Sequence, residues 1–215
     1  MPQDPLGTRS PDVNPYSMAQ AITAGLLFLS PVYSAADSAL IIQVENDAHI
    51  PGGILSQAEV LTQQIFHDAG VQTRWTGPGI ENACRSAMLG VRILSSSSTL
   101  REAPDALGVA VVSDRPENSW LADIFYGAIA QRVVTRSETV VLLANVIAHE
   151  VGHLLLGPNH SVGQLMRGEW VNRGLNSPAK LSPLRFDRGE ARQLLDAAST
   201  RLNTCIPRDP NQKAP

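Results

Sequence analysis

The fold of this chain is decided by the stretch AHEVGHLLLGPNH at residues 148–160. It holds His149 and His153, four positions apart, with Glu150 directly after the first histidine. On an α-helix, residues four apart lie one turn apart on the same face. The two imidazoles can therefore point at a common metal ion, and zinc is the ion typical of this spacing. Glu150 stands where its carboxylate can reach a water molecule on that ion.

The residues around this motif predict a long buried helix. Thr135-x-x-Glu138 is a capping-box signature for the start of a helix. From position 137 to position 156 there is no proline, and Gly152 is the sole glycine. The segment is apolar on nearly all sides, which is typical of a buried helix. Chance histidines on an ordinary apolar helix are the alternative, but two buried imidazoles need partners, and a metal supplies one.

A catalytic zinc site needs a third protein ligand and a position left for water. His160 is the first candidate, because Gly157 can end the helix in a left-handed conformation and turn the chain back toward the ion. Glu169 is the second candidate, since a carboxylate from a later element completes other zinc sites. His160 could also be a surface-turn histidine beside Pro158. The sequence leaves the third ligand open between His160 and Glu169.

The rest of the chain predicts strands and helices in an α+β order. Strand patterns occur at 39–45, 71–75, 89–94 and 108–112, with the last expected in the interior of the sheet. The segment 120–134 is ambiguous: residues 122–126 could form an edge strand, whereas residues 129–134 fit one or two helical turns. Ser56-x-x-Glu59 predicts the start of a helix that stops at Gly70. Asp187-x-x-Glu190 predicts a capped helix through about Leu202.

Composition favours one main domain with a sizeable core. The chain has 215 residues, of which 43% are hydrophobic. Its formal net charge is −3, and no basic cluster is present, which argues against a nucleic-acid partner. We expect a domain over 38–205, a disordered tail over 206–215, and a monomer.

The amino-terminal segment predicts export. Residues 1–17 are polar and proline-rich, so they are either a disordered tail or a mis-assigned start. Residues 18–36 resemble a signal peptide that ends in small residues near Ala36, although the usual positive n-region is missing. A helix buried in the mature fold is the alternative; a membrane span fits less well, because the apolar run is short and contains Pro31. We expect a secreted or periplasmic protein without stable membrane insertion after cleavage.

The two cysteines fit an oxidising compartment. Cys84 and Cys205 have no Cys-x-x-Cys spacing, so they do not look like metal ligands. After export they could form one disulfide between the middle of the chain and its end. Two unpaired buried thiols are the alternative.

Residues 148–166 resemble the zinc-binding signature of the metzincin peptidases. The signature runs His-Glu-x-x-His-x-x-Gly-x-x-His, and the Ser161 that follows His160 is similar to the matrixin branch. Residues 163–166, which end in Met166, resemble the methionine turn beneath the metal; an ordinary core methionine is the alternative. One residue departs from the pattern, because three leucines instead of two residues separate His153 from Gly157. This insertion puts the third ligand in question more than the metal.

The resemblance implies both a fold and an activity. The fold would be a mixed twisted sheet packed on helices, with a buried zinc helix and a small C-terminal subdomain that ends in a helix. The activity would be that of a zinc metalloendopeptidase acting on peptide or protein substrates, with His149, His153 and His160 as ligands and Glu150 as general base. A secreted zinc-binding module without turnover and a zinc hydrolase of non-peptide amides are the alternatives.

Overall fold

The computed structural model describes residues 39–79, 84–96, 106–115, 118–168 and 182–205. Within these ranges the strands form one sheet in the order β2-β1-β3-β5-β4. They are β1 (Leu40–Asn46), β2 (Thr73–Thr76), β3 (Met88–Leu94), β4 (Gly108–Val111) and β5 (Leu121–Phe125). β1 pairs in parallel with β2 and β3, β3 pairs in parallel with β5, and β4 runs antiparallel to β5.

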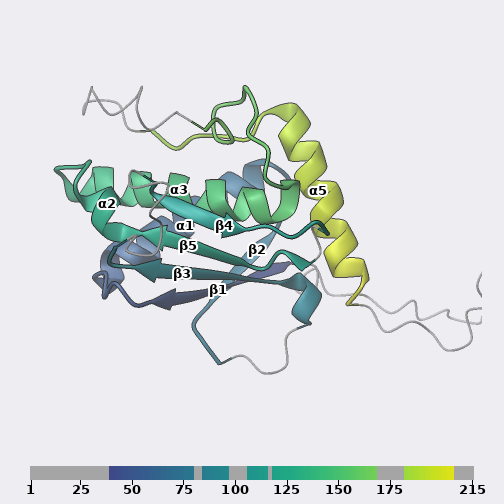
Figure 1. The fold of residues 1–215 in the computed structure, drawn as a ribbon, viewed down its shortest axis with the longest axis horizontal. Coiled ribbons are helices and arrows are strands. Elements are labelled where there is room, and N and C mark those ends of the chain that lie inside the picture. The colour runs from purple at the N-terminus through teal and green to yellow at the C-terminus, as the bar shows by residue number, and fades with distance from the viewer. Residues whose placement is uncertain (1–38, 80–83, 97–105, 116–117, 169–181, 206–215) are drawn as a thin grey trace, which may run out of the picture. The chain divides into compact units, whose positions relative to one another are not determined.

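The helix α3 lies across the sheet beside α1, and α5 lies near the end of α3 (Figure 1). Their bounds are α1 (Gly52–Asp68), α2 (Tyr126–Ala130), α3 (Arg136–Leu156) and α5 (Arg188–Asn203), with a short 3₁₀ turn, η2, at Arg85–Ala87. Together with the mixed sheet they confirm the predicted α+β fold.

Alternation along the strands builds the core. In β3, Leu89, Val91 and Ile93 are buried and belong to one hydrophobic cluster with residues of α1 and α3. The opposite face of the sheet carries polar side chains. There Arg92 forms a bidentate ion pair with Asp123 of β5, with the closest N–O distance 2.8 Å. The helices therefore cover the face that holds the cluster.

Both capping boxes predicted for the later helices are present. At α3, Thr135 Oγ1 accepts from the Glu138 N–H, and Glu138 Oε2 accepts from the Thr135 N–H at 2.8 Å. At α5, Asp187 Oδ1 accepts from the N–H groups of Gly189 and Glu190, and Glu190 Oε2 accepts from the Asp187 N–H at 2.7 Å. These boxes satisfy N–H groups that have no partner inside the helix.

Two expectations about the first half of the chain are wrong. The Ser56 capping box does not exist, because α1 already begins at Gly52, where the carbonyl of Pro51 accepts from the N–H groups of Ile54 and Leu55. Strand β4 is not interior but forms the edge of the sheet, and residues 121–125 of the ambiguous segment form the strand inside it. The apolar character of β4 comes from its contacts with α3 above it rather than from a strand on each side.

The helix α3 is apolar and long enough to span a bilayer by composition, but 89% of its most apolar window is buried inside the fold. Its hydropathy is that of a central core helix. The predictions for residues 1–17, 18–36 and 206–215 fall outside the described residues.

Candidate metal site

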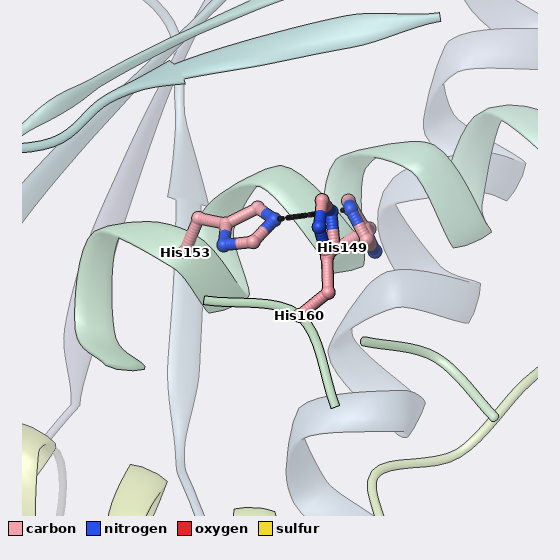
Figure 2. Close-up of side chains that lie close together, drawn as sticks. All are labelled: His149, His153 and His160. Atoms are coloured by element: carbon pink, nitrogen blue, oxygen red, sulfur yellow. Dashed lines mark hydrogen bonds between the residues drawn. The ribbon is translucent and has the colours of Figure 1, made fainter. Parts of the chain in front are cut away.

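Three histidine rings converge at one point beside α3 (Figure 2). The Nε2 atom of His153 lies 3.1 Å from Nε2 of His149 and 3.3 Å from Nε2 of His160. His149 and His153 are buried on successive turns of α3, whereas His160 is exposed in the loop after the helix. The structure thus brings the predicted three-histidine set together, with candidate ligand atoms all within 4.8 Å of one another.

Backbone carbonyls fix the tautomers of the two helical histidines. His149 Nδ1 lies 2.7 Å from the carbonyl oxygen of Leu165, and His153 Nδ1 lies 2.8 Å from that of Gly157. A carbonyl oxygen only accepts, so each Nδ1 must carry the hydrogen. In the neutral rings both Nε2 atoms are then bare acceptors that face each other and cannot hydrogen-bond to one another.

This arrangement of acceptor nitrogens favours a bound cation. A shared proton would require an imidazolium, but burial lowers the pKa of His149 to about 4 and also lowers the pKa of His153. At neutral pH both rings are therefore uncharged. Neutral imidazoles oriented through Nδ1–H bonds to carbonyls are the form in which histidine ligates a metal. The donor set fits a metal ion.

The extra leucine before Gly157 is absorbed by the end of the helix. α3 continues through Leu156, and the Gly157 N–H bonds to the His153 carbonyl at 2.9 Å. Gly157 has φ 92° and ψ −175°, which is a region that glycine alone adopts readily. The φ is positive as expected, but the ψ lies outside the left-handed helical region. This conformation aims the Gly157 carbonyl back at His153, and His160 still reaches the other two rings.

Glu150 lies against the edge strand β4. Its carboxyl group accepts a hydrogen bond from the backbone of Ala110, and burial raises its pKa to about 8. Gly108 makes room for it, because a Cβ at that position would lie 2.7 Å from Glu150 Cγ. The Phe125 N–H donates to the carbonyl of Leu107, which precedes β4, so in this antiparallel pair alternate residues bond to β5 and the Ala110 N–H points away from it. Glu150 therefore sits at the outer edge of the sheet.

Met166 packs under the motif helix. It is buried, and its Sδ would lie 2.6 Å from a Cβ at Gly152. Gly152 directly precedes His153, so the methionine sulfur lies beneath the turn that carries both histidines. This is where the resemblance placed Met166. The alternative ligand Glu169 lies outside the described residues.

Sequence reasoning missed Asn145, which lies one turn before His149. Its side chain donates to the Ser182 carbonyl at 3.2 Å and accepts from the Leu184 N–H at 2.9 Å. It thereby fixes the segment that leads into α5 against the motif helix. A polar residue on a helix that is otherwise apolar was the available signal, because a buried amide needs partners.

The structure joins Cys84 and Cys205 in a disulfide at the end of α5. Next to it, the buried Arg201 donates to the carbonyls of Leu154, Ser119 and Ser86 at 3.1, 2.6 and 3.3 Å. The first of these carbonyls is in the last turn of α3, where a cation is favoured by the helix dipole. Arg201 and the disulfide thus hold α5 against the C-terminal end of the motif helix.

Comparisons with known proteins support the fold and leave the family open. No protein-family model matches the sequence, and no curated protein matches it in sequence. Among solved structures, it is similar to the crystal structure of archaemetzincin from Methanopyrus kandleri, with a TM-score of 0.51. The two sequences are 12% identical, and the match covers 75% of this chain and 97% of that chain. The described fold is therefore metzincin-like, as the signature at 148–166 predicted.

Proposed function

We propose that this protein is a zinc-dependent peptidase. One observation carries the proposal: two oriented, neutral imidazoles and a third from a loop converge through their Nε2 atoms, and a buried carboxyl group, Glu150, follows the first of them. A purely structural site would have no use for that carboxyl group. The metzincin-like fold adds support at the level of the scaffold.

His149, His153 and His160 would hold the ion. Three nitrogen ligands with a position left open form the donor set of catalytic zinc sites. A zinc ion in such a site lowers the pKa of a bound water to about 7 and polarises a substrate carbonyl. Leu165 and Gly157 keep the two helical rings in the ligating tautomer through their carbonyl oxygens.

Glu150 would move the proton. Its pKa near 8 in the metal-free fold is close to neutrality, and a nearby cation favours its charged form. In that form it can accept the proton of the attacking water and later deliver it to the leaving amine. The Ala110 backbone hydrogen bond holds the carboxyl group in place.

Strand β4 offers a binding edge for an extended peptide. It lies at the end of the described sheet, and Glu150 sits at its outer edge. Main-chain groups at such an edge can pair with a substrate chain laid alongside it. This pairing would bring a peptide bond next to Glu150, which favours a peptide or protein substrate over a small amide.

Export remains a proposal that rests on residues 18–36 and on the disulfide. A structural disulfide is typical of secreted or periplasmic proteins and rare in the cytosol. Amino-terminal sequencing of the protein recovered from the medium or periplasm of its host would test it, with cleavage near Ala36 as the expected result.

The test of the function combines metal analysis with cleavage of an unfolded protein such as casein. We expect about one zinc per chain and cleavage that a chelator abolishes and added zinc restores. Glu150→Gln should retain zinc but lose cleavage by at least about a thousandfold, because it keeps the shape of the side chain but cannot accept the proton. Zinc binding without cleavage by the unaltered chain would contradict the peptidase proposal. Unimpaired cleavage by Glu150→Gln would contradict the role of Glu150.

A further test separates the two candidates for the third ligand. His160→Ala is expected to weaken zinc binding more than Glu169→Ala, since the His160 ring nitrogen already lies 3.3 Å from that of His153. The reverse order in a zinc titration would transfer the role to Glu169.

A further inference from the structure

The two capping boxes of this chain have the same design but different surroundings. At α3, Glu138 Oε2 accepts from the N–H groups of Val134 and Thr135, and these hydrogen bonds lie at the surface. At α5, Glu190 is buried and uses its two carboxylate oxygens in different places. Oε2 completes the cap with Asp187, whereas Oε1 accepts from the hydroxyl of Ser161. Capping a helix alone does not require this second contact or this burial.

Ser161 directly follows His160 and connects several parts of its loop. Its N–H donates to the Met166 carbonyl at 2.9 Å, and its Oγ accepts from the Gly163 N–H at 2.9 Å while donating to Glu190. The loop lies close over the carboxylate, because a Cβ at Gly163 would be 2.5 Å from Glu190 Oε1. Glu190 therefore anchors the loop to α5 at the residue next to the third histidine.

His160 depends on such an anchor more than the other two histidines do. The rings of His149 and His153 are fixed by a buried helix and by Nδ1–H bonds to carbonyls. The His160 ring is exposed on a loop, with its Nε2 atom 3.3 Å from that of His153 and its ring stacked on that of His149. Its position therefore follows from the path of its own backbone, which Ser161 and Glu190 fix.

We propose that Glu190 is a positioning residue for the third metal ligand, acting through the Ser161 hydroxyl to hold His160 at the site. The inference rests on the proposed metal site but does not depend on peptide hydrolysis. Partners that orient a ligand are worth about ten- to a hundredfold in metal affinity at other sites. Glu190 is buried, and a hydrogen bond to a carboxylate is stronger than one between neutral groups.

The test measures zinc dissociation constants of the full chain, stripped of metal, by competition with a chromogenic chelator. Ser161→Ala and Glu190→Gln should each raise the zinc dissociation constant about tenfold. Glutamine can satisfy only one of the two donors, because its amide nitrogen does not accept. The double variant should bind zinc little more weakly than the weaker-binding single variant, since both substitutions break the same contact. In the Co²⁺-loaded chain, both variants should alter the visible absorption spectrum.

Two cap variants serve as matched controls. Asp187→Ala removes the cap of the same helix but leaves the Glu190 contact with Ser161, and Glu138→Gln alters the equivalent cap of α3. Both should lower the melting temperature while leaving the zinc dissociation constant and the Co²⁺ spectrum unchanged.

The inference is overturned if Ser161→Ala binds zinc as tightly as the Asp187→Ala control. This comparison decides the matter even where Glu190→Gln fails to fold, because Ser161→Ala removes a single hydroxyl. If the unaltered chain binds no zinc, both this inference and the proposed function fall. If it binds zinc but cleaves nothing, the proposed function alone falls.

Discussion

The candidate metal site has a helical half and a loop half, and different kinds of contact position the residues of each. His149, Glu150 and His153 lie on a buried helix, where spacing alone sets their relative positions. His160 lies on an exposed turn, where a glycine with positive φ, a serine hydroxyl and a carboxylate from α5 set its position. The helical half is specified by residues close in sequence, and the loop half by contacts between residues up to 29 positions apart.

This difference means that the two halves should fail differently. Side chains in the helical half are packed against neighbours, so a substitution there should alter both stability and metal affinity. The loop half is exposed to solvent on one side, so a substitution there should alter metal affinity more than stability.

The largest expected effects come from two single variants, each of which removes the candidate ligand of one half. His153→Ala should raise the zinc dissociation constant by on the order of a thousandfold or more, because its Nε2 lies 3.1 and 3.3 Å from the Nε2 atoms of the other two rings. His160→Ala should cost on the order of a hundredfold and leave a weaker two-histidine site. Chelator competition on both variants measures this, and equal losses would show that the two halves contribute alike.

In the metal-free protein, the pH dependence of the free energy of unfolding tests whether Glu150 is shielded from water. Burial raises the pKa of Glu150 from 4.5 to about 8 in the fold, so the folded form keeps a proton that the unfolded form releases between these values. The stability due to this group is therefore present below pH 4.5 and lost as the pH rises to 8. Glu150→Gln keeps a neutral side chain throughout.

With chelator present, the Glu150→Gln variant should match the unaltered chain near pH 4.5. At pH 8 the free energy of unfolding of the variant should exceed that of the unaltered chain by on the order of 4 kcal/mol. Urea unfolding at a series of pH values measures the difference. Parallel pH profiles for the two proteins would show that Glu150 is solvated.

Gly157 joins the two halves, and its replacement should disturb both. An alanine at φ 92° and ψ −175° is strained by about 1–3 kcal/mol. The variant should therefore unfold more readily, and its shifted carbonyl should release the His153 Nδ1–H and weaken zinc binding. Gly52→Ala is the control, because Gly52 is in α1 and a Cβ there meets nothing within 4 Å. Thermal melts with and without zinc test this, and a neutral Gly157→Ala would exclude the role given to its backbone.

The smallest expected effect is on the turnover number, through Glu150, the proposed general base. In Gly108→Ala, the new Cβ would push Glu150, whose Cγ would otherwise lie 2.7 Å away. The turnover number should fall about tenfold, since a displaced base transfers protons less well, while the zinc dissociation constant stays unchanged. Steady-state kinetics beside a zinc titration separate the two, and weakened zinc binding would show that β4 supports the ligands as well.

The placement of His149, Glu150 and His153 on one capped helix could be predicted from the sequence because its determinants are local. Thr135 and Glu138 define the start of α3, and the spacing of His149 and His153 defines the side on which the candidate metal site lies. The capped helix at Asp187 was predictable for the same reason. Each of these features depends on residues within one or two turns of each other.

One failed prediction has a local cause, and the other depends on contacts between distant residues. Ser56 and Glu59 form a capping pattern, but the carbonyl of Pro51 starts α1 one turn earlier. The place of β4 at the sheet edge depends on which strand pairs with β5, and apolar residues alone do not specify that. The contacts of Glu190 with Ser161 and of Asn145 with residues 182–184 join elements that no periodicity relates.

The disulfide between Cys84 and Cys205 closes a covalent ring of the chain, with a sequence separation of 121 residues. Every residue assigned to the site, from Glu150 and the three histidines to Glu190, lies inside that ring. A single peptide-bond cut between the two cysteines would therefore open the ring without releasing either piece. In a chain exposed to proteases, all the proposed ligands of the site would therefore stay tethered to one another after one such cut.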